Sequence, residues 1–433
     1  MITSRQRLFH SARCGRKTDP GRRTASNVPL PEFRQPRAVV IAGFARTPIG
    51  AFCGGLASVP AVQLGSTAIS AALRRARLEP EEVEMVVLGQ ALPSGCGQSP
   101  ARQASALAEI PPSVDCTGVS KGCASGMKAV MFAAQSVALG LVDIAVAGGM
   151  ESASQAPYLL RHARSGGYKY GHGTLEDSIL QDGMWDSMTG CHLGSCMERT
   201  IAEMGITRQE QDAFAVESYR RAAEAWQRGA MDNAVSLVRL PVSAGGQKMH
   251  PRDAHVSCDE EYSRLKLQSV AHLPPVFEEG GTITAASASS LNDGAGALVL
   301  VAEDRAQSMG LQARYRILSY ADHGMSPSEF AVAPAGAMRS SMHLAGLPTV
   351  DFYEIHETFA ALPIANMRLL KLDKSRVNIN GGAVALGNPL GASGANILCS
   401  LLNVLEQQEA RTGCAAVGNG GGGASAMVVE RLQ

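Results

Sequence analysis

The amino-acid sequence predicts a mixed α/β fold built from two similar halves, with a different region inserted between them. In residues 38–152, short apolar runs alternate with segments of helical periodicity. The same alternation returns after residue 313. Residues 153–283 break the pattern, because they are first polar and glycine-rich and then helical. These three observations indicate two β-α units and an insertion.

Strands and helices alternate through the first half. The run "AVVIA" predicts a buried strand at Ala38–Ala42, and apolar residues at helical spacing predict a helix over 61–77. The elements expected next are a strand at Met85–Leu88, a helix at Arg102–Ala108, a strand at Val114–Thr117, a helix at Ala124–Leu139 and a strand over 143–149. This order implies right-handed crossovers and a mostly parallel, buried sheet.

The second half repeats this order, which indicates an internal duplication. Its expected elements are a strand over 314–321, a helix over 335–345, a strand over 350–356, a helix over 358–371, a short strand over 377–381, a helix at Ala392–Glu406 and final strands over 414–418 and 426–432. The inserted region carries a capping box at Thr207 and Glu210, which predicts a long helix ending near Gln227. An insertion at one end of a parallel sheet commonly covers a binding crevice.

Composition excludes two classes of function. The formal net charge is zero and aromatic residues make up 5% of the chain, which argues against a nucleic-acid-binding surface. The longest apolar runs fall short of the ~18 residues that a membrane span needs. Residues 1–37, by contrast, hold nine basic and two acidic residues. This segment is predicted to be a transit peptide for the mitochondrial matrix, and a disordered basic extension is the alternative.

One of the ten cysteines is a candidate nucleophile. The cysteines form no CxxC pair and no ligand spacing with histidines, so they do not predict a zinc site. Cys123, in "VSKGCASGMKA", follows the third strand at the start of a predicted helix. Unpaired amides and the helix dipole favour a thiolate at such a position. The alternative is a buried, inert cysteine at a strand end.

Three loops of the second half are expected to meet Cys123 at one sheet edge. They are "YEIHETFA" (353–360), "GGAVALGNPLGASG" (381–394) and "VGNGGGGASAM" (417–427). Neither a phosphate-loop motif nor a G-x-S-x-G nucleophile elbow is present. The residues therefore predict a cysteine in one half that faces glycine-rich loops from the other.

These motifs together resemble the thiolase family. "VSKGCASGMKA", "GGMESASQAPY", "LNDGAGALVL", "HETFA", "NINGGAVALGNPLGASG" and "GNGGGGASAMVVE" occur in order, and the resemblance covers about residues 38–431. Within the family, "LGSCMERT" and "YGHGTLEDSILQDGM" are most similar to the mitochondrial members that transfer acetyl groups. The resemblance implies duplicated β-α-β-α-β-α-β-β halves with an inserted loop domain. The implied parts are the basic segment 1–37, a first half of 38–152 plus 284–304, a loop domain over 153–283 and a second half over 305–433.

The resemblance also implies reversible Claisen chemistry on acyl-CoA. Cys123 stands where the family's nucleophile takes the acyl group. Asn388 stands at the family's catalytic histidine, and Gly418 at its second cysteine. Asn cannot act as a base and Gly has no side chain, although a general acid or base typically contributes ~10²–10⁴-fold to a rate. Cys414, four residues from Gly418, is a weak substitute.

A third departure lies in "HETFA". His356 stands where many family members carry Asn, and it is a candidate to donate to the thioester oxygen or to recover some base function. Capping of a strand end is the alternative. Glu357 is expected to orient the site.

Substrate and ion contacts follow from the same resemblance. The residues expected to contact coenzyme A are His192, Tyr219, Arg264, Leu265, Lys266 and Ser289, with Phe330 shaping a small acyl pocket. Ser269 and Ala331 depart from the family pattern. The residues expected around a potassium ion are Tyr219, Ala285, Ala286, Ala288 and Val384. No covalent cofactor is expected.

Two functions remain open at this point. The first is a short-chain acyl-CoA C-acetyltransferase with a Cys123 acyl-enzyme, impaired by Asn388 and Gly418. The second is a degenerate relative that binds acyl-CoA without efficient Claisen chemistry, as a regulatory or structural subunit or a slow thioesterase. The family suggests a homodimer or homotetramer.

Overall fold

Strands from both halves form one mixed sheet in residues 36–241 and 255–432, which the computed structural model describes. The strands of this sheet are β1 (Val39–Arg46), β2 (Gly50–Ala51), β3 (Met85–Gly89), β4 (Asp115–Val119), β5 (Ile144–Ser152), β12 (Asn292–Ala302), β13 (Tyr315–Gly324), β14 (Phe352–Ile355), β15 (Thr412–Asn419) and β16 (Gly423–Arg431). Their order is β14-β15-β16-β13-β1-β12-β5-β3-β4, with β2 beside β12. Because β1 pairs with β13, the two halves share the sheet.

The prediction of a mostly parallel sheet is wrong. β3 pairs in parallel with β4 and β5, and β14 with β15, but the central strands β1, β12, β13 and β16 pair antiparallel. β12 follows the inserted region and β16 follows β15 through a tight turn, so neither is delivered by a crossover helix. The strand expected over 377–381 is also wrong, because only Val377 bridges Tyr353 there.

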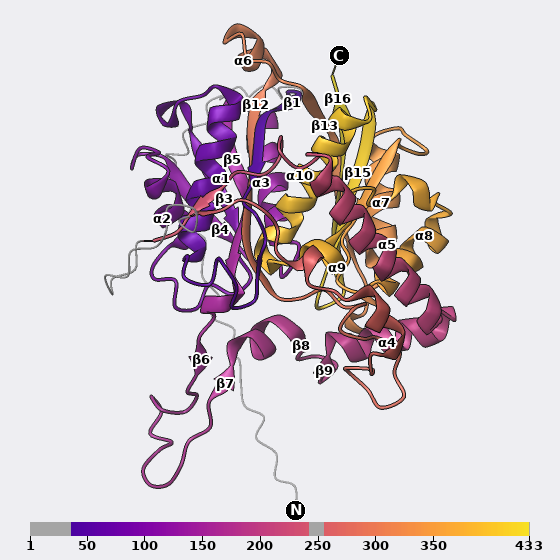
Figure 1. The fold of residues 1–433 in the computed structure, drawn as a ribbon. Helices are drawn as coiled ribbons and strands as arrows, with labels where there is room; N and C mark the ends of the chain where they lie inside the picture. The colour runs from indigo at the N-terminus through magenta and orange to yellow at the C-terminus, as the bar shows by residue number, and fades with distance from the viewer. Residues whose placement is uncertain (1–35, 242–254, 433) are drawn as a thin grey trace, which may run out of the picture. The chain divides into compact units, whose positions relative to one another are not determined.

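Helices cover the sheet on both sides and fill the space between its halves. They are α1 (Ala61–Ala76), α2 (Pro100–Leu107), α3 (Ser125–Ala138), α6 (Glu303–Ser308), α7 (Ala333–Leu344), α8 (Ala361–Leu370), α9 (Ala383–Leu386) and α10 (Leu390–Gln407). Figure 1 shows α3 and α10 side by side between the strands of the two halves. The core around α3 and α10 includes strand residues from both halves, such as Val87 and Val417. α1 and α2 pack on the outer face of the first half, and α7 and α8 on that of the second.

Glycines on α3 and β5 allow α10 to approach both elements closely. A Cβ atom at Gly126 would lie 2.9 Å from the backbone nitrogen of Ala395, and one at Gly149 would lie 2.2 Å from the carbonyl oxygen of Gly391. Real side chains cannot occupy that space, so the contact requires glycine. The packing brings the turn before α3, which carries Cys123, next to the loop before α10, which carries Asn388.

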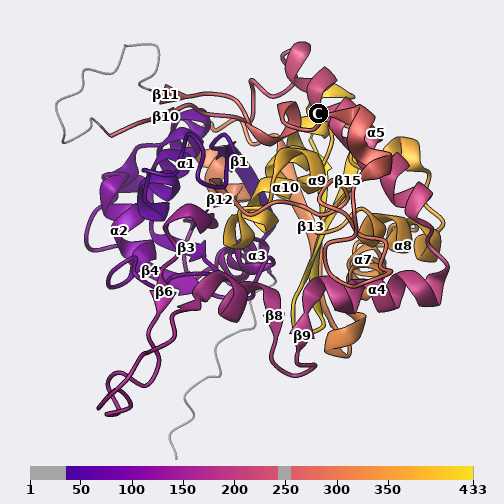
Figure 2. The same ribbon diagram turned by 60° about the horizontal axis from the view of Figure 1, so that its bottom comes forward.

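The region between the halves contains short hairpins and two long helices. Its elements are β6 (Tyr158–Leu159), β7 (Glu176–Asp177), β8 (Trp185–Asp186), β9 (Cys191–His192), α4 (Leu193–Met204), α5 (Arg208–Gln227), β10 (Val238–Arg239) and β11 (His255–Val256). In Figures 1 and 2 the β6–β7 hairpin extends away from the sheet. The predicted capping box is confirmed: Thr207 and Glu210 begin α5, which ends at Gln227.

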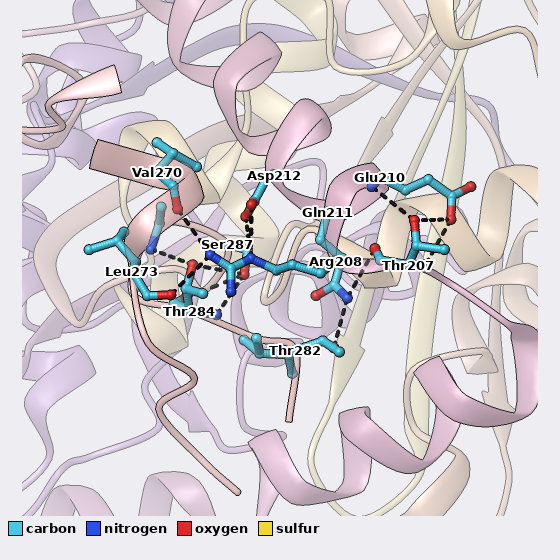
Figure 3. A network of polar contacts seen from close by, with 12 residues as sticks. Thr207, Arg208, Glu210, Gln211, Asp212, Val270, Leu273, Thr282, Thr284 and Ser287 are labelled. Carbon is cyan, nitrogen blue, oxygen red and sulfur yellow. Dashed lines mark hydrogen bonds and ion pairs between the residues drawn. The ribbon is translucent and has the colours of Figure 1, made fainter. Parts of the chain in front are cut away.

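The start of α5 holds two loop segments in place (Figure 3). Arg208 donates to the carboxylate of Asp212 at 2.8 Å and to the carbonyl oxygens of Val270 and Leu273 at 2.9 and 3.0 Å. Gln211 donates to the hydroxyl of Thr282 at 2.9 Å. α5 thus positions two parts of the chain that precede β12, residues 270–273 and Thr282.

From Pro36 onward the chain forms one compact unit, so the division into halves and a loop domain stays a prediction. Residues 1–35, most of the predicted targeting segment, lie outside the described residues. Within the described ranges, no helix combines the length and apolarity that crossing a membrane requires.

A buried ion pair anchors the segment after β11. Arg46 donates to both carboxylate oxygens of Asp259 at 2.7 and 2.8 Å, and the two side chains are 1% and 0% exposed. Asp259 also accepts from the backbone N–H of Ile49 at 2.8 Å and from Trp226 Nε1–H at 3.1 Å. The carboxylate therefore joins the end of β1 to α5.

Asp259→Asn is expected to lower the free energy of unfolding by about 3 kcal/mol or more, because it leaves the Arg46 charge buried and unpaired. Denaturant titration measures the loss. Asp143→Asn is the matched control: it removes the charge partner of Arg37 in a pair whose side chains are 40% and 27% exposed, and it should cost no more than about 1 kcal/mol. Equal losses in the two variants would contradict the prediction.

Candidate active site

Cys123 lies in a tight turn immediately before α3. The turn depends on Gly122, whose φ of +52° favours glycine. The Ser125 hydroxyl accepts from the Lys121 N–H at 2.7 Å and donates to the Gly122 carbonyl at 2.5 Å. Lys121 Nζ lies 2.6 Å from the carboxylate of Asp322 on β13. The second half of the chain therefore helps to hold the turn that carries the cysteine.

Burial keeps Cys123 protonated at neutral pH. The residue is 6% exposed. Burial first, and then the nearby charge of Glu151, raise the pKa of the thiol to about 12, while a hydrogen bond from the Asn388 side chain lowers it. The stabilisation of a thiolate that was expected at the helix start is therefore smaller than the cost of removing its charge from water.

Glu151 joins the two sides of the site. Its carboxylate accepts from the backbone N–H groups of Ala91 and Gly391 at 2.9 and 2.8 Å, so it ties the end of β3 to the start of α10. Burial raises the pKa of this carboxyl to about 7 despite these hydrogen bonds. Glu151 stands in "GGMESASQAPY", but no role for it was predicted from the sequence.

Asn388 is the hydrogen-bonding centre of the site. Its Nδ2 donates to the Ser289 hydroxyl at 3.2 Å, and its Oδ1 accepts from the Ser393 hydroxyl at 2.6 Å. His356 Nε2 lies 3.1 Å from the same Oδ1. Since the Asn388 side chain also lowers the pKa of the Cys123 thiol, it lies near that thiol, and the structure groups Ser289, His356 and Asn388 beside Cys123.

His356 is a neutral ring with both nitrogens occupied. An amide oxygen only accepts, so Nε2 carries the hydrogen and donates to Asn388 Oδ1. Nδ1 then accepts from the Thr358 hydroxyl at 3.0 Å. Burial lowers the pKa of the ring to about 4. In this arrangement His356 orients the Asn388 amide.

Glu357 holds the segments around the site together through three hydrogen bonds. One carboxylate oxygen accepts from the Ser218 hydroxyl at 2.8 Å and from the Val384 N–H at 3.1 Å, and the other from Asn378 Nδ2 at 2.8 Å. Glu357 thereby links α5 to the loop that carries Asn388. Sequence reasoning missed both Ser218 and Asn378, although Asn378 is the first residue of the motif "NINGGAVALGNPLGASG".

A small cavity lies beside His356. Its volume is about 30 Å³, and Glu354 and Asn396 also line it. Among the described residues, Glu354 Oε1 and both polar atoms of the Asn396 side chain have no hydrogen-bond partner. The cavity is large and polar enough to hold an ordered water.

Gly418 lies at the end of β15 with room for a small side chain. A Cβ atom there would lie 3.3 Å from Pro334 Cγ and 3.4 Å from the carbonyl oxygen of Phe330. Phe330 itself is buried, as expected of a pocket wall. Cys414 lies four residues before Gly418 on the same strand. It is fully buried, and its sulfur lies 3.9 Å from the Ser341 hydroxyl of α7.

The remaining predicted contact residues divide into a group that is buried or half-buried and a group that is exposed. His192 stacks on Phe277 with ring centroids 4.7 Å apart, and Phe277 meets Phe359 edge-on at 5.6 Å. Tyr219 is buried in one cluster with Val384, and Leu265 packs against that cluster. Arg264 and Lys266 are exposed.

The residues expected around potassium offer suitable donors. The carbonyl oxygens of Ala285 and Ala286 accept no hydrogen bond within residues 36–241 and 255–432. Burial raises the pKa of Tyr219, so its hydroxyl remains neutral. Neutral hydroxyl and carbonyl oxygens suit a hard cation. The oxygen atoms of these residues are therefore of the kind that binds a potassium ion.

Comparison with known proteins gives a consistent result along the chain. The family model described as thiolase, N-terminal domain, matches residues 39–304, and that described as thiolase, C-terminal domain, matches residues 311–431. The chain is 48% identical over 404 residues to acetyl-CoA acetyltransferase 2 of Arabidopsis thaliana, covering 93% of this chain and 99% of the relative. It is 45% identical over 397 residues to the mitochondrial acetyl-CoA acetyltransferase of Mus musculus, covering 91% of each.

Solved structures show the same fold. The Acat5 thiolase of Ascaris suum, in complex with coenzyme A, superposes with a TM-score of 0.86 at 39% identity, covering 92% of this chain and all of that one. The acetyl-CoA acetyltransferase of Syntrophomonas wolfei gives a TM-score of 0.87 at 36% identity, with the same coverage of both chains. The α/β fold with two related halves, expected from the motifs, is thereby confirmed.

Proposed function

The chain belongs to the thiolase family, and from that premise we propose that it is a short-chain acyl-CoA C-acetyltransferase in which Cys123 carries the acyl group. The observation that carries this proposal is the hydrogen-bonded group of Asn388, Ser289 and His356, in which the Asn388 side chain is near enough to Cys123 to lower the pKa of its thiol. A nucleophile next to positioned donors is the arrangement that acyl transfer requires.

The acyl transfer step uses the Cys123 thiol and the side chains grouped beside it. The Cys123 sulfur attacks the thioester carbonyl carbon, the bond to the coenzyme A sulfur breaks, and the cysteine proton ends on the released thiol. The Asn388 amide lowers the pKa of the Cys123 thiol but cannot take its proton. With the pKa of that thiol at about 12, only a small fraction is thiolate at neutral pH, and the step is slow.

The carbon–carbon bond step is the weaker one. A proton must leave the α-carbon of acetyl-CoA before condensation, and Gly418 has no side chain to take it. His356 is not a replacement, because both of its ring nitrogens already have partners. We therefore propose that Claisen chemistry is much slower than acylation.

Asn388 and Gly418, which cannot accept a proton, favour a second candidate function. A chain with an assembled binding site but no proton acceptor at Gly418 would bind acyl-CoA, form the acyl-enzyme and lose the acyl group to water. This would make it a slow thioesterase, or a regulatory or structural subunit. The two candidates share a fold and ligand and differ in turnover.

The proposal includes a ligand set, an assembly and a location. The ligand is a coenzyme A thioester with no covalent cofactor, and potassium would lie among the oxygens of Tyr219, Ala285, Ala286, Ala288 and Val384. β4 is the last strand of the sheet and its residues are partly exposed, which supports a homodimer or homotetramer joined along this edge. The basic segment 1–37 supports the mitochondrial matrix.

Incubation with acetyl-CoA, followed by intact-mass measurement, is the experiment that tests the proposal. An added acetyl group on Cys123 is expected, together with slow cleavage of acetoacetyl-CoA when coenzyme A is supplied. An adduct without any cleavage would favour the second candidate. A protein that binds neither acetyl-CoA nor coenzyme A would contradict both.

A further inference from the structure

Two cysteines that the proposed reaction does not use lie in contact on either side of His192 in the chain. The sulfur atoms of Cys191 and Cys196 are 3.3 Å apart. An S–S bond of about 2.0 Å would require them to approach by only roughly 1.3 Å. Cys191 is half-buried on β9, whereas Cys196 is fully buried in the first turns of α4. Figure 2 shows β8 and β9 beside α4.

The surroundings hold the two sulfurs together. Cys191 pairs with Asp186 in the β8–β9 hairpin. The buried Asp186 carboxylate accepts from the Thr189 N–H and hydroxyl at 2.8 and 3.0 Å. The Thr189 hydroxyl oxygen in turn lies 3.2 Å from the Cys191 sulfur and 3.7 Å from the Cys196 sulfur. The hairpin is thus fixed, and little rearrangement separates the thiols from a disulfide.

We propose that Cys191 and Cys196 form a reversible disulfide by exchange with a small-molecule disulfide such as oxidised glutathione, and that its closure weakens binding at the acyl-CoA site. The second part of this proposal rests on the proposed function. The first part does not, because it concerns only the two sulfurs and their contact.

The exchange balances in two steps. The Cys191 thiolate attacks one sulfur of oxidised glutathione, breaks its S–S bond and releases one glutathione thiolate. The Cys196 sulfur then attacks the Cys191 sulfur of the mixed disulfide and releases the second glutathione. Two cysteine thiols are oxidised and one glutathione disulfide is reduced, and the two cysteine protons end on the two glutathione thiols. Cys191 reacts first because its sulfur is the accessible one.

Closure would act on the site through His192. This residue lies between the two cysteines, caps α4 by accepting the Gly194 N–H at 2.9 Å, and stacks on Phe277. Phe277 packs so closely on α4 that a Cβ atom at Gly194 would lie 2.3 Å from its ring. Phe277 also contacts Phe359, three residues after His356. Movement of the start of α4 therefore reaches the loop that orients Asn388.

Peptide mapping in glutathione redox buffers tests the disulfide. Trypsin releases residues 170–199 as one peptide that contains Cys191 and Cys196 and no other cysteine. After trapping free thiols with N-ethylmaleimide, the peptide from oxidised buffer should carry no adduct and be lighter by two hydrogen atoms, and dithiothreitol should reverse this. A peptide with two maleimide adducts, or one that stops at a glutathione adduct on Cys191, would overturn the proposal.

Two variants control this experiment. Cys196→Ser should accumulate the glutathione adduct on Cys191, because the second step has no thiol. Cys258→Ser removes an exposed cysteine elsewhere and should leave the disulfide unchanged. Disulfide loss in Cys258→Ser would show that the bond forms between other partners, which contradicts the assignment.

Calorimetry with desulfo-coenzyme A tests the coupling, because this ligand has no thiol that could reduce the disulfide. The oxidised protein should bind it at least about 5-fold more weakly than the reduced protein, the lower end of usual coupling between sites. By reciprocity, saturating ligand should shift the redox midpoint toward the reduced form by the same factor. Equal affinities would overturn the coupling. No binding to the reduced protein would instead refute the proposed function, while the peptide result still decides the disulfide.

Discussion

Asn388→His combined with Gly418→Cys is expected to raise the rate of acetoacetyl-CoA cleavage by about 10³-fold over the unmodified protein, because it supplies two proton-transfer groups that each contribute ~10²–10⁴-fold elsewhere. Spectrophotometric loss of acetoacetyl-CoA in the presence of coenzyme A measures the rate. The comparison is made at saturating substrate, so that a change in binding alone does not account for it.

The site has the geometry that this gain requires. The Asn388 side chain is near enough to lower the pKa of the Cys123 thiol, so a ring at the same position would lie near the proton that must be removed. At Gly418, a new Cβ atom would meet Pro334 Cγ at 3.3 Å, which is close but requires only a small shift. Gly418 also lacks the positive φ that would strain any other residue.

The matched control distinguishes the effect of a thiol at position 418 from the effect of the added Cβ atom. Asn388→His with Gly418→Ala introduces the same Cβ atom against Pro334 but no proton acceptor. It should recover acylation of Cys123 and leave cleavage low. Equal cleavage by the Ala and Cys variants would show that Gly418 is not where proton transfer is missing, and the account of the weak step would be wrong.

The sequence indicated the local elements of this fold better than their arrangement. Apolar periodicity lies within each segment, so it placed the strand at Met85 and the helices before Leu139 and Glu406 to within a few residues of the observed bounds. Strand direction depends on distant pairing. β12 pairs with both β1 and β5 although it follows them by far in the chain, and nothing local to it indicates an antiparallel arrangement.

The candidate site shows the same division. Cys123 was indicated by its position after a strand, and His356 and Asn388 by the family resemblance; the structure places His356 and Asn388 in contact, and Asn388 lowers the pKa of Cys123. The partners that set their chemistry were not indicated. Thr358 occupies the second nitrogen of His356, and burial followed by the charge of Glu151 raises the pKa of Cys123. Both effects come from packing, because burial determines which hydrogen bonds form and how strongly a charge acts.

Cys123→Ala is expected to abolish the acetyl adduct that the unmodified protein gains from acetyl-CoA. The thiol whose pKa the Asn388 side chain lowers would be lost, and the hydroxyls of Ser289 and Ser393 are engaged with Thr358, Asn388 and Pro389. In the unmodified protein, the acylation rate should rise about tenfold per pH unit between pH 7 and 9, because the thiolate fraction grows in that proportion below a pKa of about 12. Rapid quench and intact-mass measurement follow both quantities.

Cys414→Ala is the matched control for this loss. Like Cys123, Cys414 is buried, and burial raises the pKa of its thiol to about 12, but its partner is Ser341 on α7. A shared pKa predicts similar reactivity for the two thiols, whereas contact with Asn388 predicts acylation of Cys123 alone. Retention of the adduct in Cys414→Ala, with its loss in Cys123→Ala, would show that position beside Asn388 selects the nucleophile. An adduct that persists in Cys123→Ala would mean that acetyl-CoA acylates another residue, and the proposed acyl-enzyme would be wrong.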